Sequence, residues 1–172
     1  MSRSASRLKS VFINFDNTHD TTSTEQAVHK NMNTFVHPMC GAGYVGGDYS
    51  YQNELQWQLQ IGSKMFPEYP VRSLAETFYQ LKKALGVHGS AFHSISITPE
   101  QYRNDHFIIG VDTEKILEAG FTGLNTRSGD LMVVRGKYAN SNASTTWANA
   151  IYVIMHTDQI LEIRDTGAQV FD

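Results

Sequence analysis

Seven histidines are the residues of this sequence best suited to bind a metal ion: His19, His29, His37, His88, His93, His106 and His156. In cupin-like β-sandwich enzymes, imidazole nitrogens and a carboxylate on neighbouring strands bind a metal together. The spacing here is unfavourable, because the sequence has no H-x-H pair, no H-E-x-x-H motif and no carboxylate at a matching offset. We therefore expect surface and loop histidines and no metal or other cofactor, with a cupin-like metalloenzyme as a minor alternative.

The triplet Asp165-Thr166-Gly167 matches the active-site motif of aspartic proteases and follows an apolar run that begins at Ile160. That chemistry needs two aspartates that share a proton, together with supporting strands after the motif. Five residues follow Gly167 in this sequence. We therefore expect a tight turn with glycine at a positive φ and no catalytic residue.

Gly41-Ala-Gly-Tyr-Val-Gly46 fits the G-x-G-x-x-G pattern of dinucleotide-binding proteins. The pattern binds a pyrophosphate only where a buried strand leads into it and a helix begins on it, and neither flank fits. Cys40 has no nucleophile signature around it, and Asn142-Ala-Ser144 is a glycosylation sequon that matters only in a secreted chain. These motifs therefore predict neither nucleotide binding nor catalysis, and we expect that the protein is not an enzyme.

The chain of 172 residues is long enough for one domain with a substantial core. Its net charge of −3 argues against a broad surface for nucleic acid. The longest apolar run, residues 150–155, is far shorter than a membrane-spanning helix. We expect residues 1–10 to form a basic, flexible tail and residues 11–172 to form the domain. The tail could instead be an organelle-targeting signal, a processed arm or a strip that docks on an acidic neighbour.

Serine, threonine, asparagine and glycine make up 51 of the 172 residues, which favours strands and turns over long helices. The clearest strand is 54–61, where Leu55, Trp57, Leu59 and Ile61 alternate with glutamines that could serve a polar subunit contact. Other predicted strands are Val11–Phe15, Phe107–Val111, Leu131–Tyr138, Trp147–His156 and Ile160–Arg164, whereas 16–38 reads as a loop or an arm and Pro67 and Pro70 mark a bend.

One long helix is predicted after this bend. Ser73 is a suitable N-cap and Glu76 its capping-box partner, and Gly86 ends the helix. Its apolar stripe predicts burial of Leu74, Phe78, Leu81 and Leu85, with Gln80 and Lys83 on the opposite side. Thr98, Pro99 and Gln101 predict a second, short helical turn. Strands with so few helices predict an all-β fold, a single jelly-roll β-sandwich into which one capped helix and a short helical turn are inserted.

Three segments together resemble the major capsid proteins of the double-jelly-roll viral lineage, of the polinton-like virus, adintovirus and virophage type. They are residues 59–81, where a strand runs through the double-proline bend into the capped helix, residues 119–131, and the end of the chain, residues 151–153 and 158–172. The resemblance spans Leu8 to Asp172 as a pattern. Members of this lineage carry two jelly rolls in one chain, whereas this chain has the length of one and matches the C-terminal one. It would be either a fragment or a single-jelly-roll relative, and the sequence around Arg7 favours the fragment.

The resemblance implies a structural protein of the virion. It would be a self-assembling subunit of an icosahedral shell, arranged as a trimer, with other capsid proteins as partners. It would have no catalytic activity, small-molecule substrate, specific nucleic-acid binding or membrane span. A carbohydrate-binding jelly roll is the main alternative, since Tyr44, Tyr49, Tyr51 and Trp147 could stack on sugars.

Overall fold

The computed structural model describes residues 5–16, 35, 37–38, 55–87, 94–104, 106–114, 123–126, 130–138 and 150–171. Its elements, in chain order, are β1 (Leu8–Asp16), β2 (Leu55–Ile61), β3 (Lys64–Val71), α1 (Leu74–Ala84), α2 (Pro99–Asn104), β4 (Ile109–Asp112), β5 (Met132–Tyr138), β6 (Ala150–Thr157), β7 (Ile160–Arg164) and β8 (Gly167–Phe171). In this part of the chain, no helix is long and apolar enough to cross a membrane.

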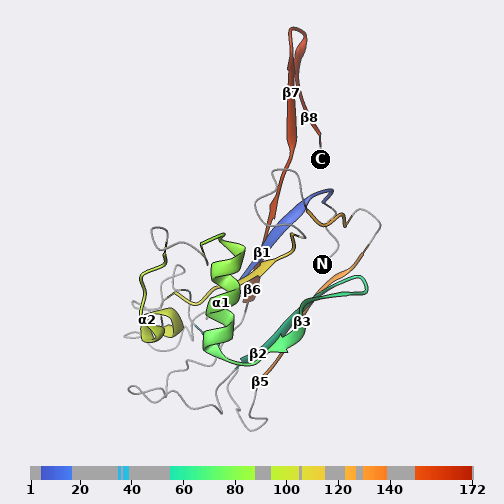
Figure 1. The fold of residues 1–172 in the computed structure, drawn as a ribbon. Coiled ribbons are helices and arrows are strands. Elements are labelled where there is room, and N and C mark those ends of the chain that lie inside the picture. The colour runs from blue at the N-terminus through green and yellow to red at the C-terminus, as the bar shows by residue number, and fades with distance from the viewer. Residues whose placement is uncertain are drawn as a thin grey trace, which may run out of the picture.

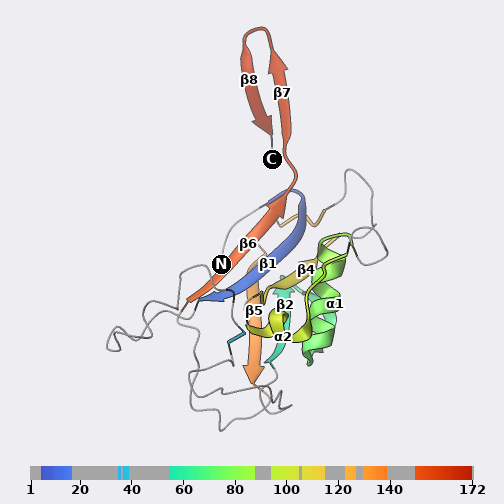
Figure 2. The same ribbon diagram turned by 90° about the vertical axis from the view of Figure 1, so that its left-hand side faces the viewer.

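Two antiparallel three-stranded sheets form the body, with strand orders β4-β1-β6 and β3-β2-β5, and a separate hairpin joins β7 to β8. One hydrophobic cluster contains side chains from both sheets, including Val11, Ile13, Trp57 and Leu59. The hairpin projects from the body beyond the end of β6 (Figures 1 and 2). The prediction of a mainly β sandwich with two helical insertions is confirmed. The described residues supply six strands to the two sheets, whereas a jelly roll has eight, and the jelly-roll connectivity stays a prediction.

Strand β1 begins at Leu8, three residues before the predicted start, so the end of the expected basic tail belongs to the sheet. Leu8 and Ser10 are buried, and Leu8 exchanges backbone hydrogen bonds with Leu124. The Lys9 ammonium lies 3.0 Å from Asp158 and 3.4 Å from Glu114. The positive charge of this segment therefore meets acidic neighbours within the same chain.

In β2 the predicted alternation is confirmed on the core face, where Leu55, Trp57, Leu59 and Ile61 are all buried. The glutamine face differs from the expectation of an outward amide row. Gln58 is buried and its Nε2 donates to the carbonyl oxygens of Pro67 and Glu68, 3.0 Å each. Gln60 donates to the Gly62 carbonyl. The Nε2 groups of these two amides therefore bind the protein's own backbone.

Strand β3 was predicted only as a bend. It pairs with β2 from Lys64 to Phe66 and again at Val71, and the register shifts between these two places. The shift is a bulge that accommodates Pro67 and Pro70, which cannot donate to a sheet ladder. Gln58 binds the carbonyls of Pro67 and Glu68 at this bulge. The proline bend is therefore part of the sheet and not a linker between the sheet and the helix.

Helix α1 begins as predicted: the Glu76 backbone N–H donates to Ser73 Oγ at 3.1 Å. Its buried residues are Thr77 and Leu81, so the prediction of an entirely buried stripe was wrong. Leu74 and Phe78 are half-buried, and Leu85 is 46% exposed because it follows the last turn as the C-cap. On the other side, Gln80 and Lys83 are also half-buried, whereas Tyr79 is exposed.

The short helix α2 has both hydrogen bonds of a capping box, between Thr98 and Gln101. Strands β4 and β5 start one or two residues later than predicted, β6 starts at Ala150, and β7 has the predicted bounds. The sequence pattern predicted no strand at residues 167–171, where the structure has β8.

Candidate functional site

The most conspicuous surface of the described chain is one face of the β7–β8 hairpin. Leu161 pairs with Val170 and Ile163 with Ala168, so these four apolar side chains share a face. Leu161 is 56%, Ile163 76% and Val170 58% exposed. The opposite face is polar towards the turn, where it carries Glu162, Arg164 and Gln169, with an Arg164 Nε to Glu162 Oε1 contact of 2.7 Å, and it carries Ile160, 40% exposed, next to the root.

The root of this hairpin is fixed to the body. Two residues connect β6 to β7, and the first of them, Asp158, donates its backbone N–H to the Arg7 carbonyl at 3.2 Å. Its carboxylate lies 3.0 Å from the Lys9 ammonium, and hydrogen bonding to this carboxylate raises the pKa of Lys9 above its usual value. Strand β1 thus holds the hairpin in its projecting position.

An apolar groove of about 510 Å³ lies on the outer side of the sheet that contains β1. Phe12 of β1 and Ile154 of β6 line its floor, Leu81 and Leu85 one wall, and Ile95 and Ile97 the other, with His106 and Asn14 as the polar lining residues. Phe12 and Ile154 are cross-strand partners on the same face of the sheet. Ile154 is 57% exposed, so the groove opens towards β6.

The exposure of Leu85 and Ile154 at this groove was not predicted. Both stand in runs that indicate buried positions, the stripe of α1 and the apolar run of β6. The stripe extends beyond the last turn of α1, and β6 is at the edge of its sheet among the described strands. No local sequence signal distinguishes an apolar side chain at such an edge from one in the core.

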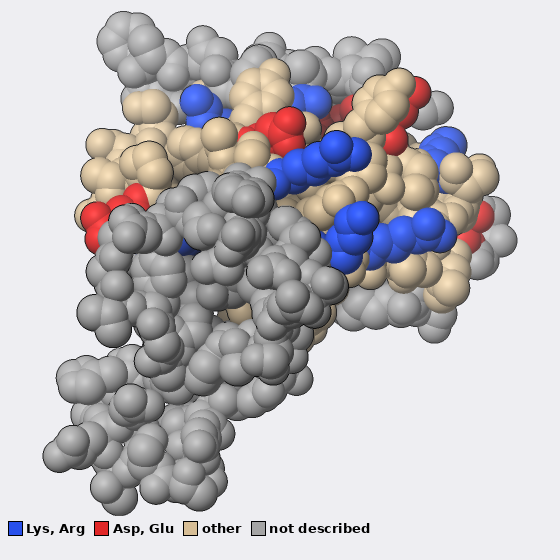
Figure 3. All heavy atoms as spheres, turned by 90° about the horizontal axis from the view of Figure 1, so that it is seen from below, with Lys and Arg blue, Asp and Glu red and all other residues tan. Residues whose placement is uncertain are grey.

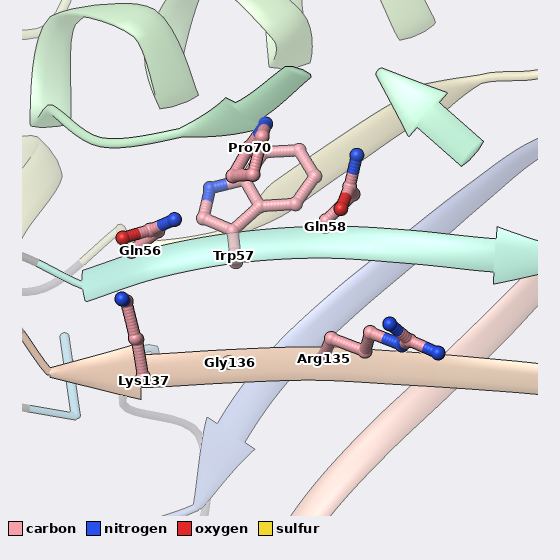
Figure 4. A pocket seen from close by; sticks show the side chains of 7 residues that line it. All are labelled: Gln56, Trp57, Gln58, Pro70, Arg135, Gly136 and Lys137. Carbon is pink, nitrogen blue, oxygen red and sulfur yellow. The ribbon is translucent and has the colours of Figure 1, made fainter. Parts of the chain in front are cut away.

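A second, polar pocket of about 280 Å³ lies over β2 and β5 (Figure 4). Gln56 is opposite Lys137 and Gln58 opposite Arg135 in the register of the two strands. In Figure 4, Lys137 points towards Gln56, and Pro70 lies beside the indole of Trp57. The cations of Arg135 and Lys137, with the amide of Gln56, could donate hydrogen bonds to a carboxylate or a phosphate here. Trp57, however, is buried and does not present a free ring face for a sugar.

The two edges that β5 and β6 form differ in charge. Arg135 and Lys137 lie on β5, where cations discourage pairing with a further strand, whereas β6 carries no charged residue. On the molecular face seen from below, Lys and Arg side chains lie near Asp and Glu side chains (Figure 3).

Three of the histidines lie among the described residues, and they are not close enough to form a metal centre. His37 is buried, with its ring 4.4 Å from the Phe107 ring, and His106 and His156 are exposed. Burial, with a smaller effect of the Arg103 charge, lowers the pKa of His37 to about 3. Within the described part of the chain, no group of three or more His, Cys, Asp or Glu could hold a metal ion.

The Asp165-Thr166-Gly167 triplet forms the turn between β7 and β8, as predicted. Arg164 pairs with Gly167 across a two-residue loop, and Gly167 has a φ of 141°. Several other predictions lie outside the described residues: the motif at 41–46, Cys40, the sequon at 142–144, the aromatic residues Tyr44, Tyr49, Tyr51 and Trp147, and His19, His29, His88 and His93.

The comparisons with known proteins identify no relative. No family model, no curated protein and no solved structure matches the chain.

Proposed function

We propose that this chain is a structural subunit of a viral capsid, a jelly-roll building block that self-assembles into trimers and then into an icosahedral shell within the virion. In this proposal the protein has no catalytic role, and its partners are further copies of itself and other capsid proteins. The observation that carries the proposal is the projecting β7–β8 hairpin, whose apolar face is exposed.

An isolated two-stranded hairpin is at best marginally stable in water, and an apolar face on it favours association. Among the described residues, the body contacts the root of the hairpin through Arg7 and Lys9, which bind Asp158. The edge strand β6, which carries no Asp, Glu, Lys or Arg, adds exposed Tyr152 and Ile154, the cross-strand partners of Asn14 and Phe12. A partner that covers these side chains would remove apolar area from water, at about 25 cal/mol per Å².

The resemblance to capsid proteins supports the shell role specifically. Its first segment, residues 59–81, includes the end of β2, all of β3 and most of α1, and its last segment includes three residues of β6 and the hairpin. Part of its middle segment, residues 123–126, lies beside the start of β1 and is hydrogen-bonded to Ala5 and Leu8. The described parts of the three segments thus include strands of both sheets, the helix and the hairpin.

The test is the mass of the native chain by light scattering over a range of protein and salt concentrations, followed by electron microscopy of any assemblies. We expect trimers or larger closed particles. A chain that stays monomeric in every condition would overturn the proposal, and glycan binding by that monomer on an array would favour the carbohydrate-binding alternative.

A matched pair of variants tests the part played by the hairpin. Leu161→Lys combined with Ile163→Lys should reduce self-association strongly, because two desolvated ammonium groups would destabilise any apolar contact. Gln169→Lys, on the polar face of the same hairpin, should leave self-association unchanged. Circular dichroism should show a folded body in both variants, and unchanged assembly of the double variant would contradict the role of this face.

A further inference from the structure

We propose that the apolar face of the β7–β8 hairpin of one copy docks into the groove between α1 and β6 of a second copy. This inference rests on the proposed function, self-assembly, and names the two surfaces that meet. It assigns an occupant to the groove and a receptor to the hairpin.

The two surfaces match in chemistry. The hairpin face presents Leu161, Ile163, Ala168 and Val170 and no polar side chain. The groove is apolar except for Asn14 and His106. Its volume of about 510 Å³ lies within the range of sites that enclose most of a ligand, roughly 300–1,000 Å³. Contact would therefore bury apolar side chains on both partners without leaving a charge unpaired.

The hairpin can dock with its polar face in water. Glu162 and Arg164 contact each other at 2.7 Å and lie opposite the apolar face. The floor of the groove is a sheet face, formed by Phe12 and Ile154 on neighbouring strands. A hairpin laid on this floor would pack as one sheet face on another, with side chains from both faces interdigitating between them.

The occupant belongs to a second copy because the protein's own hairpin is directed away from its groove. The hairpin leaves the end of β6 and extends from the body on the side away from α2 (Figures 1 and 2). Only Asp158 and Gln159 connect β6 to β7, and Asp158 is bound to Arg7 and Lys9. Folding the hairpin back would break these contacts.

A contact between two different surfaces of the same chain is heterologous. Each copy offers one hairpin and one groove, so copies join head to tail, and a suitable rotation closes them into a ring. A ring of three copies would be the trimer of the proposed function.

Complementation between two variants tests this arrangement. Leu161→Lys with Ile163→Lys disables the hairpin and keeps the groove, whereas Leu85→Lys with Ile154→Lys disables the groove and keeps the hairpin. All four residues are exposed in the single chain, so the body should fold. By sedimentation velocity each variant alone should be monomeric, and an equal mixture should form a dimer, held by the one remaining hairpin-groove contact.

Ile151→Lys is the matched control for the groove variant. Ile151 is on the same strand as Ile154 and has similar exposure, 54% against 57%, but it pairs with Phe15 on the other face of the sheet and does not line the groove. We expect this variant to assemble like the native chain.

The outcomes separate the two proposals. If the native chain assembles and the groove variant assembles equally well, or the mixture stays monomeric well above the native assembly concentration, the docking is overturned and self-assembly stands. The docking is also overturned if Ile151→Lys abolishes assembly as completely as the groove variant does. If the native chain never assembles, both proposals fail.

Discussion

At the scale of single residues, a buried hydrogen-bond relay joins the helix to the sheet. The Trp57 indole N–H donates to the Thr77 hydroxyl at 2.9 Å, and that hydroxyl donates to the Ser73 carbonyl at 2.9 Å. Trp57 and Thr77 are each 2% exposed. The N-cap residue of α1 is therefore connected to the largest side chain of the core.

Thr77→Val should lower the free energy of unfolding by about 1–3 kcal/mol, because the isosteric change leaves the buried indole N–H without its acceptor. Thr77→Ser keeps the hydroxyl and loses one methyl group, so it should cost only about 1 kcal/mol. Urea unfolding at fixed protein concentration measures both values. A Val variant as stable as the native chain would show that the relay contributes nothing.

His37 is a buried base that the folded protein keeps neutral. Burial lowers its pKa from the ordinary 6.5 to about 3, and the nearby Arg103 charge acts in the same direction. The unfolded chain therefore binds a proton at a pH where the native chain does not. The contribution of neutral His37 to stability is complete above pH 6.5 and is lost as the pH falls towards 3.

His37→Gln should remove this pH dependence. Between pH 6.5 and 3, His37 makes the native chain lose up to about 1.4 kcal/mol of stability per pH unit, and the variant should lack that slope. Denaturant unfolding at several pH values checks it, and the difference between native and variant curves cancels all other titrating groups. Parallel curves would show that His37 has an ordinary pKa in the folded protein.

At the scale of elements, α1 lies unusually close to β4. A Cβ atom at Gly110 would lie 2.9 Å from Leu81 Cα and 3.0 Å from Ala84 Cβ, closer than ordinary contacts allow. The helix thus packs directly on the backbone of the strand, and this packing places Leu81 and Leu85 beside the floor of the groove.

Gly110→Ala should destabilise the protein by about 1–3 kcal/mol, because the new methyl group forces the helix away from the strand. Gly136→Ala in β5 is the matched control, since its nearest neighbour would be Leu55 Cδ1 at an ordinary 3.7 Å. That variant should be neutral or slightly more stable. Thermal unfolding compares the two, and equal melting temperatures would argue against the close approach of α1.

At the scale of the whole molecule, apolar surface is distributed unevenly. The two sheets bury one shared core, whereas β6 and the hairpin beyond it expose Ile151, Tyr152, Leu161 and Ile163. The edge strand β5 of the second sheet carries Arg135 and Lys137 instead. The edge at β6 is therefore better suited to association than the edge at β5.

Self-association should therefore depend little on the screening of charges by salt. If apolar contact drives assembly, raising sodium chloride should leave the association constant nearly unchanged, and sodium sulfate should increase it, because sulfate strengthens apolar burial. Light scattering across both salts measures the effect. Dissociation in moderate sodium chloride would instead indicate that ion pairs hold the copies together.

The sequence by itself determined the local structure whose signals lie within a few residues. The cap of α1 at Ser73, the capping box of α2, the alternation in β2 and the glycine turn at Gly167 were all predicted and are all present. Each depends on hydrogen bonds or side-chain periodicity over a short span, and tertiary contacts did not override them.

Tertiary structure alone decided which apolar residues are covered. The proline bend became part of β3, where Gln58 binds its carbonyls, and Leu8 entered the sheet because it pairs with Thr157 of β6. Leu85 and Ile154 stayed exposed because nothing in the described chain covers the end of α1 or the edge at β6. Burial depends on partners distant in sequence, so periodicity reveals which face is apolar and the fold determines whether that face meets the core, the solvent or another copy.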